Sequence, residues 1–109
     1  MTSTEPLERR VTVHQLRIFR TVADLASFSR AAESLHLSQP AVSHQVKALS
    51  NAVGGPVVEV IGRRVQTTEI GRLLYEHGTR ILGEFDDADR ALTELHGLGR
   101  GTLRVSGDT

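Results

Sequence analysis

The stretch SQPAVSHQVKAL, residues 38–49, has the pattern of a helix with two different faces. Ser38 is a residue type that caps helix N-termini, and Pro40 is tolerated in a first turn, where the backbone N–H has no intrahelical partner. Helical spacing places three apolar side chains on one face, namely Val42, Val46 and Leu49. It places four other side chains on the opposite face, namely Pro40, Ser43, His44 and Lys47. The apolar face predicts packing in a core, and the polar face is a candidate for contact with a partner.

Two further helices are predicted before this one. Thr12 begins the first, which runs to Ala26, because Thr12 and Gln15 have the spacing of a capping box. The second is short and lies within SFSRAAESLHLS, with Ser27 or Ser29 as its cap. The connection over residues 36–38 is too short for the next helix to return antiparallel, so the two helices should meet at a steep angle. This is the helix-turn-helix arrangement.

After the quoted helix, which should end near Gly54, the pattern becomes extended. Residues 57–61 are rich in β-branched side chains, Gly62 interrupts the run, and residues 65–67 form a second short extended piece. Together they predict a two-stranded hairpin with GRR at its tip, which places Arg63 and Arg64 there. The fold class is therefore mainly α, a winged helix-turn-helix of three helices and a two-stranded wing.

A long helix should follow, capped by Thr68 and running from Glu69 to about Leu95. Its apolar residues recur at steps of three and four, close to the heptad spacing of a coiled coil. Its three glycines would each cost about 1 kcal/mol relative to alanine, so we expect close-packing positions at Gly71, Gly78 and Gly83. One small domain cannot cover so long a helix, which predicts a homodimer. The predicted dimer interface consists of Leu74, Ile81, Phe85, Ala88, Leu92 and Leu95.

Composition narrows the class of protein. The chain has 109 residues and no cysteine, which excludes disulfides and thiolate metal sites and fits a reducing, cytoplasmic location. Its first ten residues lack the apolar core of a secretory signal, and no run approaches the ~18 apolar residues of a membrane span. The net charge is zero, but residues 1–80 carry ten Lys/Arg and seven Asp/Glu whereas residues 81–109 carry three and six. The first part is therefore basic and suits an acidic partner such as DNA.

In a winged helix-turn-helix, the third helix enters the major groove of double-stranded DNA. Gln39 can bind adenine with two hydrogen bonds, Pro40 and Ala41 suit a thymine methyl group, and Ser43 can donate or accept. His44 can donate to a guanine or a phosphate, and Lys47 suits a phosphate. Backbone phosphates or the minor groove would also be contacted by residues of the second helix, the turn and the wing. These are Ser27, Ser29, Arg30, Ser38, Arg63 and Arg64.

These motifs identify a resemblance. FSRAAESLHLSQPAVSHQVKAL and the later GRRVQTTEIG resemble the N-terminal DNA-binding domain of LysR-type transcriptional regulators, over residues 14 to about 95. The resemblance implies that the third helix and the wing bind DNA as a dimer at an interrupted inverted repeat, and that the long helix pairs two subunits. The sequence departs from the family pattern where His44 replaces a frequent arginine, where Val60 replaces an arginine before the wing, and where Thr67 replaces an apolar residue.

The resemblance also implies an organisation. Residues 1–10 are expected to be a mobile tail, residues 11–68 the winged helix-turn-helix, and residues 69–96 the dimerisation linker helix. Residues 97–109 are expected to be a hinge and the first strand of an effector domain that the chain lacks. A small-molecule inducer is expected only for that missing domain, so the chain itself should need no cofactor. A tetramer is expected for the full-length regulator.

Two other classes of function fit the sequence less well. A winged helix that serves only protein contacts would favour an apolar or acidic third-helix surface and binding insensitive to salt. An enzyme is disfavoured because no nucleophile–base pair, carboxylate pair or metal set is present. The histidines lack the spacing of metal ligands, so no metal site is predicted. No motif of the sequence identifies the operator, the regulated genes, the inducer or the direction of regulation.

Overall fold

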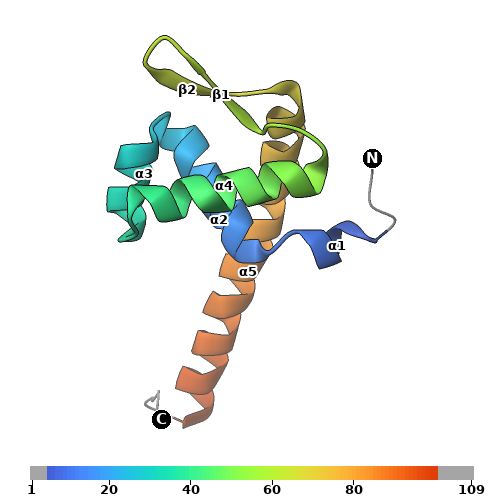
Figure 1. Ribbon diagram of the computed structural model, residues 1–109. Coiled ribbons are helices and arrows are strands. Elements are labelled where there is room, and N and C mark those ends of the chain that lie inside the picture. The colour runs from blue at the N-terminus through green and yellow to red at the C-terminus, as the bar shows by residue number, and fades with distance from the viewer. Residues whose placement is uncertain (1–4, 101–109) are drawn as a thin grey trace. The chain divides into compact units, whose positions relative to one another are not determined.

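The computed structural model describes residues 5–100, which form five helices and one hairpin (Figure 1). In chain order the elements are α1 (Leu7–Arg10), α2 (Val13–Leu25), α3 (Phe28–Leu35), α4 (Gln39–Val53), β1 (Val58–Ile61), β2 (Arg64–Thr67) and α5 (Glu69–Arg100). The chain divides into two compact units between Thr79 and Arg80. The first unit holds α1 to β2 and the first turns of α5, so the predicted winged helix-turn-helix over residues 11–68 lies within it.

The helices α2, α3 and α4 begin at the residues that the sequence predicted. Thr12 and Gln15 form a reciprocal capping box, with hydrogen bonds of 3.0 and 3.1 Å between backbone N–H groups and side-chain oxygens. Of the two serines considered for α3, Ser27 is the cap, because its Oγ accepts from the Arg30 N–H at 3.1 Å. Ser38 Oγ accepts from the Ala41 N–H at 3.2 Å and caps α4.

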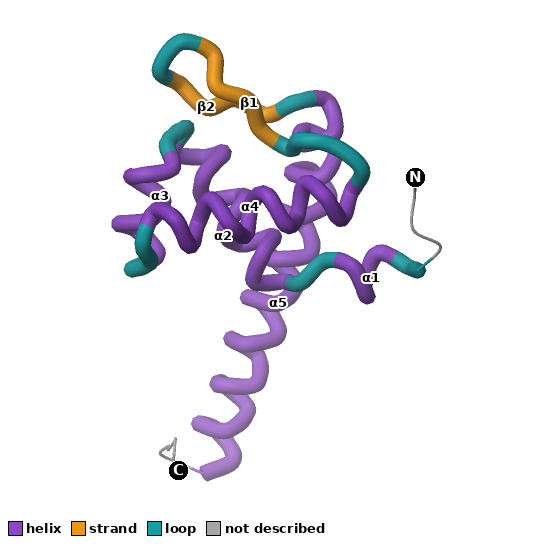
Figure 2. Tube along the Cα trace, viewed as in Figure 1, coloured by secondary structure: helices purple, strands orange, loops and turns teal. Residues whose placement is uncertain are grey.

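Two non-glycine residues make the connections of the helix-turn-helix. Ala26 ends α2 with φ of 54°, and His36 ends α3 with φ of 59°, both in the left-handed region. His36 directs its backbone N–H to the carbonyls of Ala32 and Glu33, so the last turn of α3 closes on itself. The chain then turns sharply into α4, as Figure 2 shows by the short loops between these helices.

The core lies where α2, α3 and α4 meet. It is formed by side chains that are almost or completely inaccessible, and the largest of these are Phe19, Ile18, Leu49, Val22, Val42 and Val57. The three apolar residues of the quoted stretch are all buried, which confirms the predicted inner face of α4. Burial of each such side chain contributes about 1.5–3 kcal/mol, so this small core is a main source of stability.

The wing is an antiparallel pair in which Val58 lies opposite Thr67 and Ile61 lies opposite Arg64. Gly62 has a φ of 66°, which suits the first position of a tight two-residue hairpin turn, and Arg63 is the second turn residue. Arg64 already belongs to β2, so only Arg63 of the two arginines lies in the turn. Within the wing, the Val65 N–H donates to the Ala26 carbonyl at 3.2 Å, which ties β2 to the end of α2.

Val57, just before β1, joins three elements. Its N–H donates to Ser50 Oγ on α4 at 3.1 Å, and its carbonyl accepts from the Thr68 N–H at 3.2 Å. Gly71 in the first turn of α5 lies directly against that carbonyl, since a Cβ there would be 1.8 Å from the oxygen. Of the three predicted close-packing glycines, Gly71 is confirmed, Gly78 has room for a methyl group in ordinary contact, and Gly83 faces open space.

The structure differs from the sequence prediction at both ends. Residues 7–10, expected to belong to a mobile tail, form α1, because Arg10 donates to the carbonyls of Glu5 and Ala52 and fastens this segment to the end of α4. The helix α5 continues to Arg100, past the predicted end near residue 95 or 96. Gly97 does not stop it, because a glycine weakens a helix without blocking its hydrogen bonds. The strand that the sequence predicts over residues 101–109 lies outside the described residues.

Candidate nucleic-acid interface

The leading half of α4 presents an exposed polar face. Gln39, Pro40, Ser43, His44 and Lys47 are all exposed, and Ala41 is half-buried among them. Within residues 5–100 the structure records no hydrogen bond or ion pair for the side chains of Gln39, Ser43, His44 and Lys47. These donors and acceptors are therefore not used by the fold, and they remain available to a partner.

The start of α3 supplies a second group of polar residues. Ser29 and Arg30 are exposed, and Ser27 is half-buried as the cap. Ser27 Oγ and Ser29 Oγ lie 3.1 Å apart and share a hydrogen bond. The first turn of α3 thus combines backbone N–H groups, two hydroxyls and one guanidinium group, which is the chemistry that favours an anion.

The wing supplies the third group. Arg63 and Arg64 are exposed at and beside the turn, whereas Val65, the next residue, is buried. The strand alternation explains this difference, because successive side chains of β2 point to opposite faces. Val60 and Ile61 on β1 are exposed apolar residues, 64% and 53% accessible.

Two residues that the sequence reasoning missed hold α4 in place. Ser50 lies on the inner side of α4, where its hydroxyl donates to the Val46 carbonyl at 2.9 Å and accepts from the Val57 N–H. Arg10 donates to the Ala52 carbonyl in the last turn of α4. Ser50 could have been found, because a hydroxyl four residues after Val46 on an apolar stripe needs a partner. Arg10 had no such signal, since its partner is a backbone carbonyl 42 residues away.

Most of the predicted dimer residues are exposed. Ile81, Phe85, Leu92 and Leu95 are 39%, 53%, 57% and 63% accessible, and Ala88 is exposed as well. Leu74 requires a correction, because it is partly buried and packs against the core of the first unit. Its neighbour Leu73 is 60% accessible instead. One residue along a helix is a rotation of about 100°, so a step of one exchanges the inner face for the outer face.

The structure gives no sign of metal chemistry or of a membrane segment in the part of the chain that it describes. No group of three or more His, Asp or Glu side chains in residues 5–100 is arranged to hold a metal ion. No helix in the same range is long and apolar enough to cross a membrane.

A helix-turn-helix with an unengaged polar face on its second helix, followed by a basic-tipped wing, defines the class of winged-helix nucleic-acid-binding domains. Comparison with known proteins gives the family. Residues 13–72 match the sequence profile described as "Bacterial regulatory helix-turn-helix protein, lysR family". The chain therefore belongs to the LysR family of bacterial transcriptional regulators.

Individual relatives agree with this assignment. The chain is 46% identical over 97 residues to the HTH-type transcriptional regulator CfxR of Cupriavidus necator, a match that covers 89% of this chain and 31% of that protein. The chain thus spans about a third of the length of such a relative. A crystal structure of the BenM DNA-binding domain with catB site 1 DNA is similar at a TM-score of 0.73 and 28% identity, covering 78% of this chain and 94% of that one. Oxidized OxyR of Corynebacterium glutamicum is similar at a TM-score of 0.74 and 32% identity, covering 96% and 30%.

Proposed function

We propose that this chain is the DNA-binding part of a LysR-type regulator that binds an interrupted inverted repeat as a dimer. In this proposal α4 enters the major groove and the wing contacts the backbone or the minor groove beside it. The observation that carries the proposal is the exposed face of α4, whose hydrogen-bonding side chains have no partner among the described residues. The similarity to the BenM domain, which was crystallised with DNA, supports it.

The residues of α4 divide between bases and phosphates. Gln39 and Ser43 stand in the first turns of the helix, which reach base edges in helix-turn-helix proteins, so we assign them to base recognition. Pro40 and Ala41 fit a thymine methyl group, and His44 donates to a guanine or a phosphate. Lys47 lies one turn further on and is assigned to a phosphate.

The remaining polar groups are assigned to the DNA backbone. Ser29 and Arg30 with the N-terminal N–H groups of α3 would hold one phosphate, and Ser27 and Ser38 support their helices as caps beside it. Arg63 and Arg64 would contact the backbone or a narrow minor groove from the wing. Because such contacts release counterions, binding should weaken steeply as the salt concentration rises.

The dimer contact is assigned to the exposed apolar side of α5. This helix has 32 residues and is therefore about 48 Å long at 1.5 Å per residue. Ile81, Phe85, Ala88, Leu92 and Leu95 recur at steps of four and three, so they form one stripe that a second copy would cover. A dimer would present two copies of α4 to half-sites about 34–36 Å apart. For a longer protein that contains an inducer-binding domain, we propose tetramers, with the inducer bound there.

Base recognition is tested with Gln39→Ala on a selected operator and on its single-base variants. We expect a loss of about 1–3 kcal/mol of discrimination at one base position, because a bidentate contact is worth that amount. Arg63→Ala is the matched phosphate variant, which should weaken all sequences equally and flatten the salt slope by about 1. Equal losses on every sequence for Gln39→Ala would assign this residue to positioning alone. Binding to a protein without salt dependence, and none to DNA, would favour the protein-contact alternative.

The dimer is tested by sedimentation of the chain with Leu92→Glu and with Thr93→Glu. Both residues are exposed, and Thr93 lies about 100° further around the helix, so it adds the same charge beside the stripe. We expect Leu92→Glu to dissociate the dimer and Thr93→Glu to leave its mass unchanged. A wild-type chain that stays monomeric at tens of micromolar would refute the assignment.

A further inference from the structure

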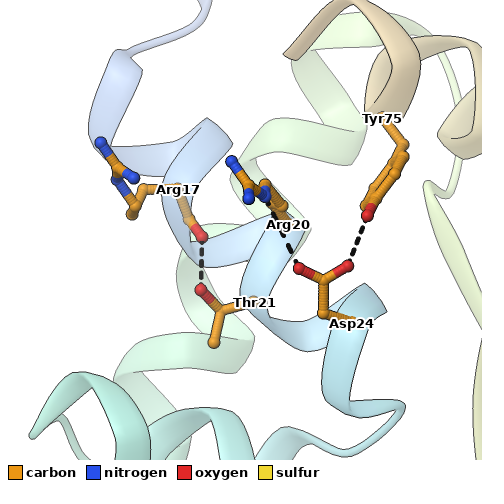
Figure 3. Close-up of polar contacts among 5 residues, drawn as sticks. All are labelled: Arg17, Arg20, Thr21, Asp24 and Tyr75. Carbon is orange, nitrogen blue, oxygen red and sulfur yellow. Dashed lines mark hydrogen bonds and ion pairs between the residues drawn. The ribbon is translucent and has the colours of Figure 1, made fainter. Parts of the chain in front are cut away.

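A side-chain hydrogen bond joins two elements that are distant in the sequence. Tyr75, in the second turn of α5, donates through its hydroxyl to Asp24 Oδ1 near the end of α2 at 2.5 Å, across 51 residues (Figure 3). The other carboxylate oxygen, Oδ2, lies 3.5 Å from Arg20 Nε one turn earlier on α2. The carboxylate of Asp24 thus has one partner at each oxygen, Tyr75 at Oδ1 and Arg20 at Oδ2.

The electrostatic environment favours a protonated Tyr75 hydroxyl that donates to Asp24. The hydrogen bond to Asp24, partial burial and the negative charge of Asp24 raise the pKa of Tyr75 above its ordinary value. The tyrosine hydroxyl therefore stays protonated throughout the physiological range and acts as the donor. A hydrogen bond to an ionised acceptor is stronger than one between neutral groups.

The packing around the contact is incomplete. A cavity of about 290 Å³ is lined by Ala23, Asp24, Thr67, Arg72 and Tyr75, so open space lies beside the hydrogen bond at the base of the wing. The ring of Tyr75 packs against the core, but its hydroxyl and the carboxylate are not enclosed. On this side of α5 the hydrogen bond therefore adds to the packing of Gly71, Leu74 and the Tyr75 ring in holding the first turns.

The orientation of the first turns of α5 also sets the direction of the rest of this helix. In the proposed dimer the far half of α5 pairs with the partner, so a rotation at the first turns of α5 changes the orientation of α4 relative to the second copy of α4. A displacement of about 3.4 Å corresponds to one base pair along the duplex. The separation of the two half-sites that the dimer accepts would thus depend on how firmly Tyr75 holds these turns.

We propose that Tyr75 and Asp24 form a positioning pair that fixes the first turns of α5 against α2 and thereby restricts the half-site spacing that the dimer accepts. This inference rests on the proposed function, because it requires a dimer that binds two half-sites. It assigns a specificity role to residues outside α4 and the wing. Asp24 and Tyr75 do not touch DNA in this proposal.

The first test reads the contact itself. Tyr75 is the one tyrosine of the sequence, which also lacks tryptophan, so the near-ultraviolet absorbance of phenolate reports on this residue alone. Asp24→Asn should lower the pKa of Tyr75 toward its ordinary value, because the charge and the ionised acceptor are removed. Thr21→Val is the matched control, since Thr21 Oγ1 donates to the Arg17 carbonyl within α2 and does not reach α5 (Figure 3). It should leave the titration unchanged, and an unchanged titration in Asp24→Asn would overturn the contact.

The second test measures affinity for operators whose half-sites are moved apart or together by one base pair. The wild type should prefer one spacing, and Tyr75→Phe should reduce that preference by about three- to tenfold, as expected for loss of one ordinary hydrogen bond at an exposed site. Asp24→Asn should have the same effect, the double variant no greater effect, and Thr21→Val none. Circular dichroism checks that each variant is folded, and Tyr75→Phe keeps the ring that packs on the core.

The outcomes separate the two proposals. If the wild type prefers one spacing and Tyr75→Phe keeps that preference in full, the positioning pair is refuted while the dimer proposal stands. If the wild type binds paired and single half-sites equally well, the dimer proposal fails and this inference fails with it. Additive effects of the two substitutions would also overturn the inference, because partners in one contact should not act independently.

Discussion

Gly71→Ala should destabilise the domain strongly although alanine is the better helix former. A Cβ at this position would lie 1.8 Å from the Val57 carbonyl oxygen and 2.8 Å from the Val57 carbonyl carbon. Contacts under 3.0 Å are essentially absent for real Cβ atoms, so α5 and Val57 would have to separate by about 1.2 Å. Val57 cannot move freely, because it is fully buried and both its N–H and its carbonyl are hydrogen-bonded.

The magnitude follows from three terms. Overpacking against a fixed group costs about 3 kcal/mol, at the upper end of the usual range. Separation of α5 from Val57 also disturbs the Thr68 cap, whose Oγ1 accepts from the Gly71 N–H at 3.0 Å and which is worth about 1 kcal/mol. The gain in helix propensity offsets about 1 kcal/mol. We therefore expect the free energy of unfolding to fall by about 3 kcal/mol.

The assay is urea unfolding followed by far-ultraviolet circular dichroism. Gly83→Ala is the matched control on the same helix, because no atom lies within 4 Å of its Cβ position. It should raise the free energy of unfolding by about 0.5–1 kcal/mol. If Gly71→Ala unfolds at the same urea concentration as the wild type, the close approach of α5 to Val57 is not a constraint and the reasoning is refuted.

Three other predictions concern stability. Ser50→Ala should cost about 1–3 kcal/mol in urea unfolding, because it leaves the buried Val57 N–H without an acceptor; a loss well under that range would mean that water replaces the hydroxyl. Ser38→Ala should cost about 1 kcal/mol through loss of the α4 cap, whereas Ser38→Asp should retain most of the stability. The stability difference between wild type and Tyr75→Phe should be constant at neutral pH, begin to fall as the pH passes the ordinary tyrosine value of about 10, and disappear above the raised folded-state value. The sign follows because a raised folded-state pKa gives a stabilisation that is present below the unfolded value and lost as pH rises through the folded value.

The helix boundaries could be predicted because they depend on local chemistry. Thr12, Ser27 and Ser38 act within three residues of themselves, and Gly54 and Gly62 take the left-handed conformations that their positions require. The exposed face of α4 follows from the same periodicity that buries Val42 and Leu49. The locations of the predicted DNA-contact residues on exposed first turns and at the wing could therefore be read from the sequence, while their contacts with DNA stay predictions.

The rest depended on contacts between distant residues. Arg10 is bound by a carbonyl at the far end of α4, and Tyr75 is bound by a carboxylate on α2, and neither pairing leaves a periodic pattern. Leu74 was assigned to the wrong face because a heptad seam tolerates a step of either three or four residues, and only packing against the core decides between them. The helix α5 extends past its predicted end because a glycine such as Gly97 weakens a helix without blocking its hydrogen bonds.

The position of Val57 has a consequence for the order of folding. Its hydrogen bonds to Ser50 and Thr68 close loops of only seven and eleven residues, whereas the contact of Tyr75 with Asp24 closes one of 51. The entropic cost of loop closure grows with the logarithm of loop length, so the short closures cost less chain entropy. We therefore expect the end of α4, the wing and the root of α5 to assemble first around Val57, and α2 to dock onto this nucleus afterwards. Substitutions at Val57 should then slow folding, while substitutions at Asp24 should mainly speed unfolding.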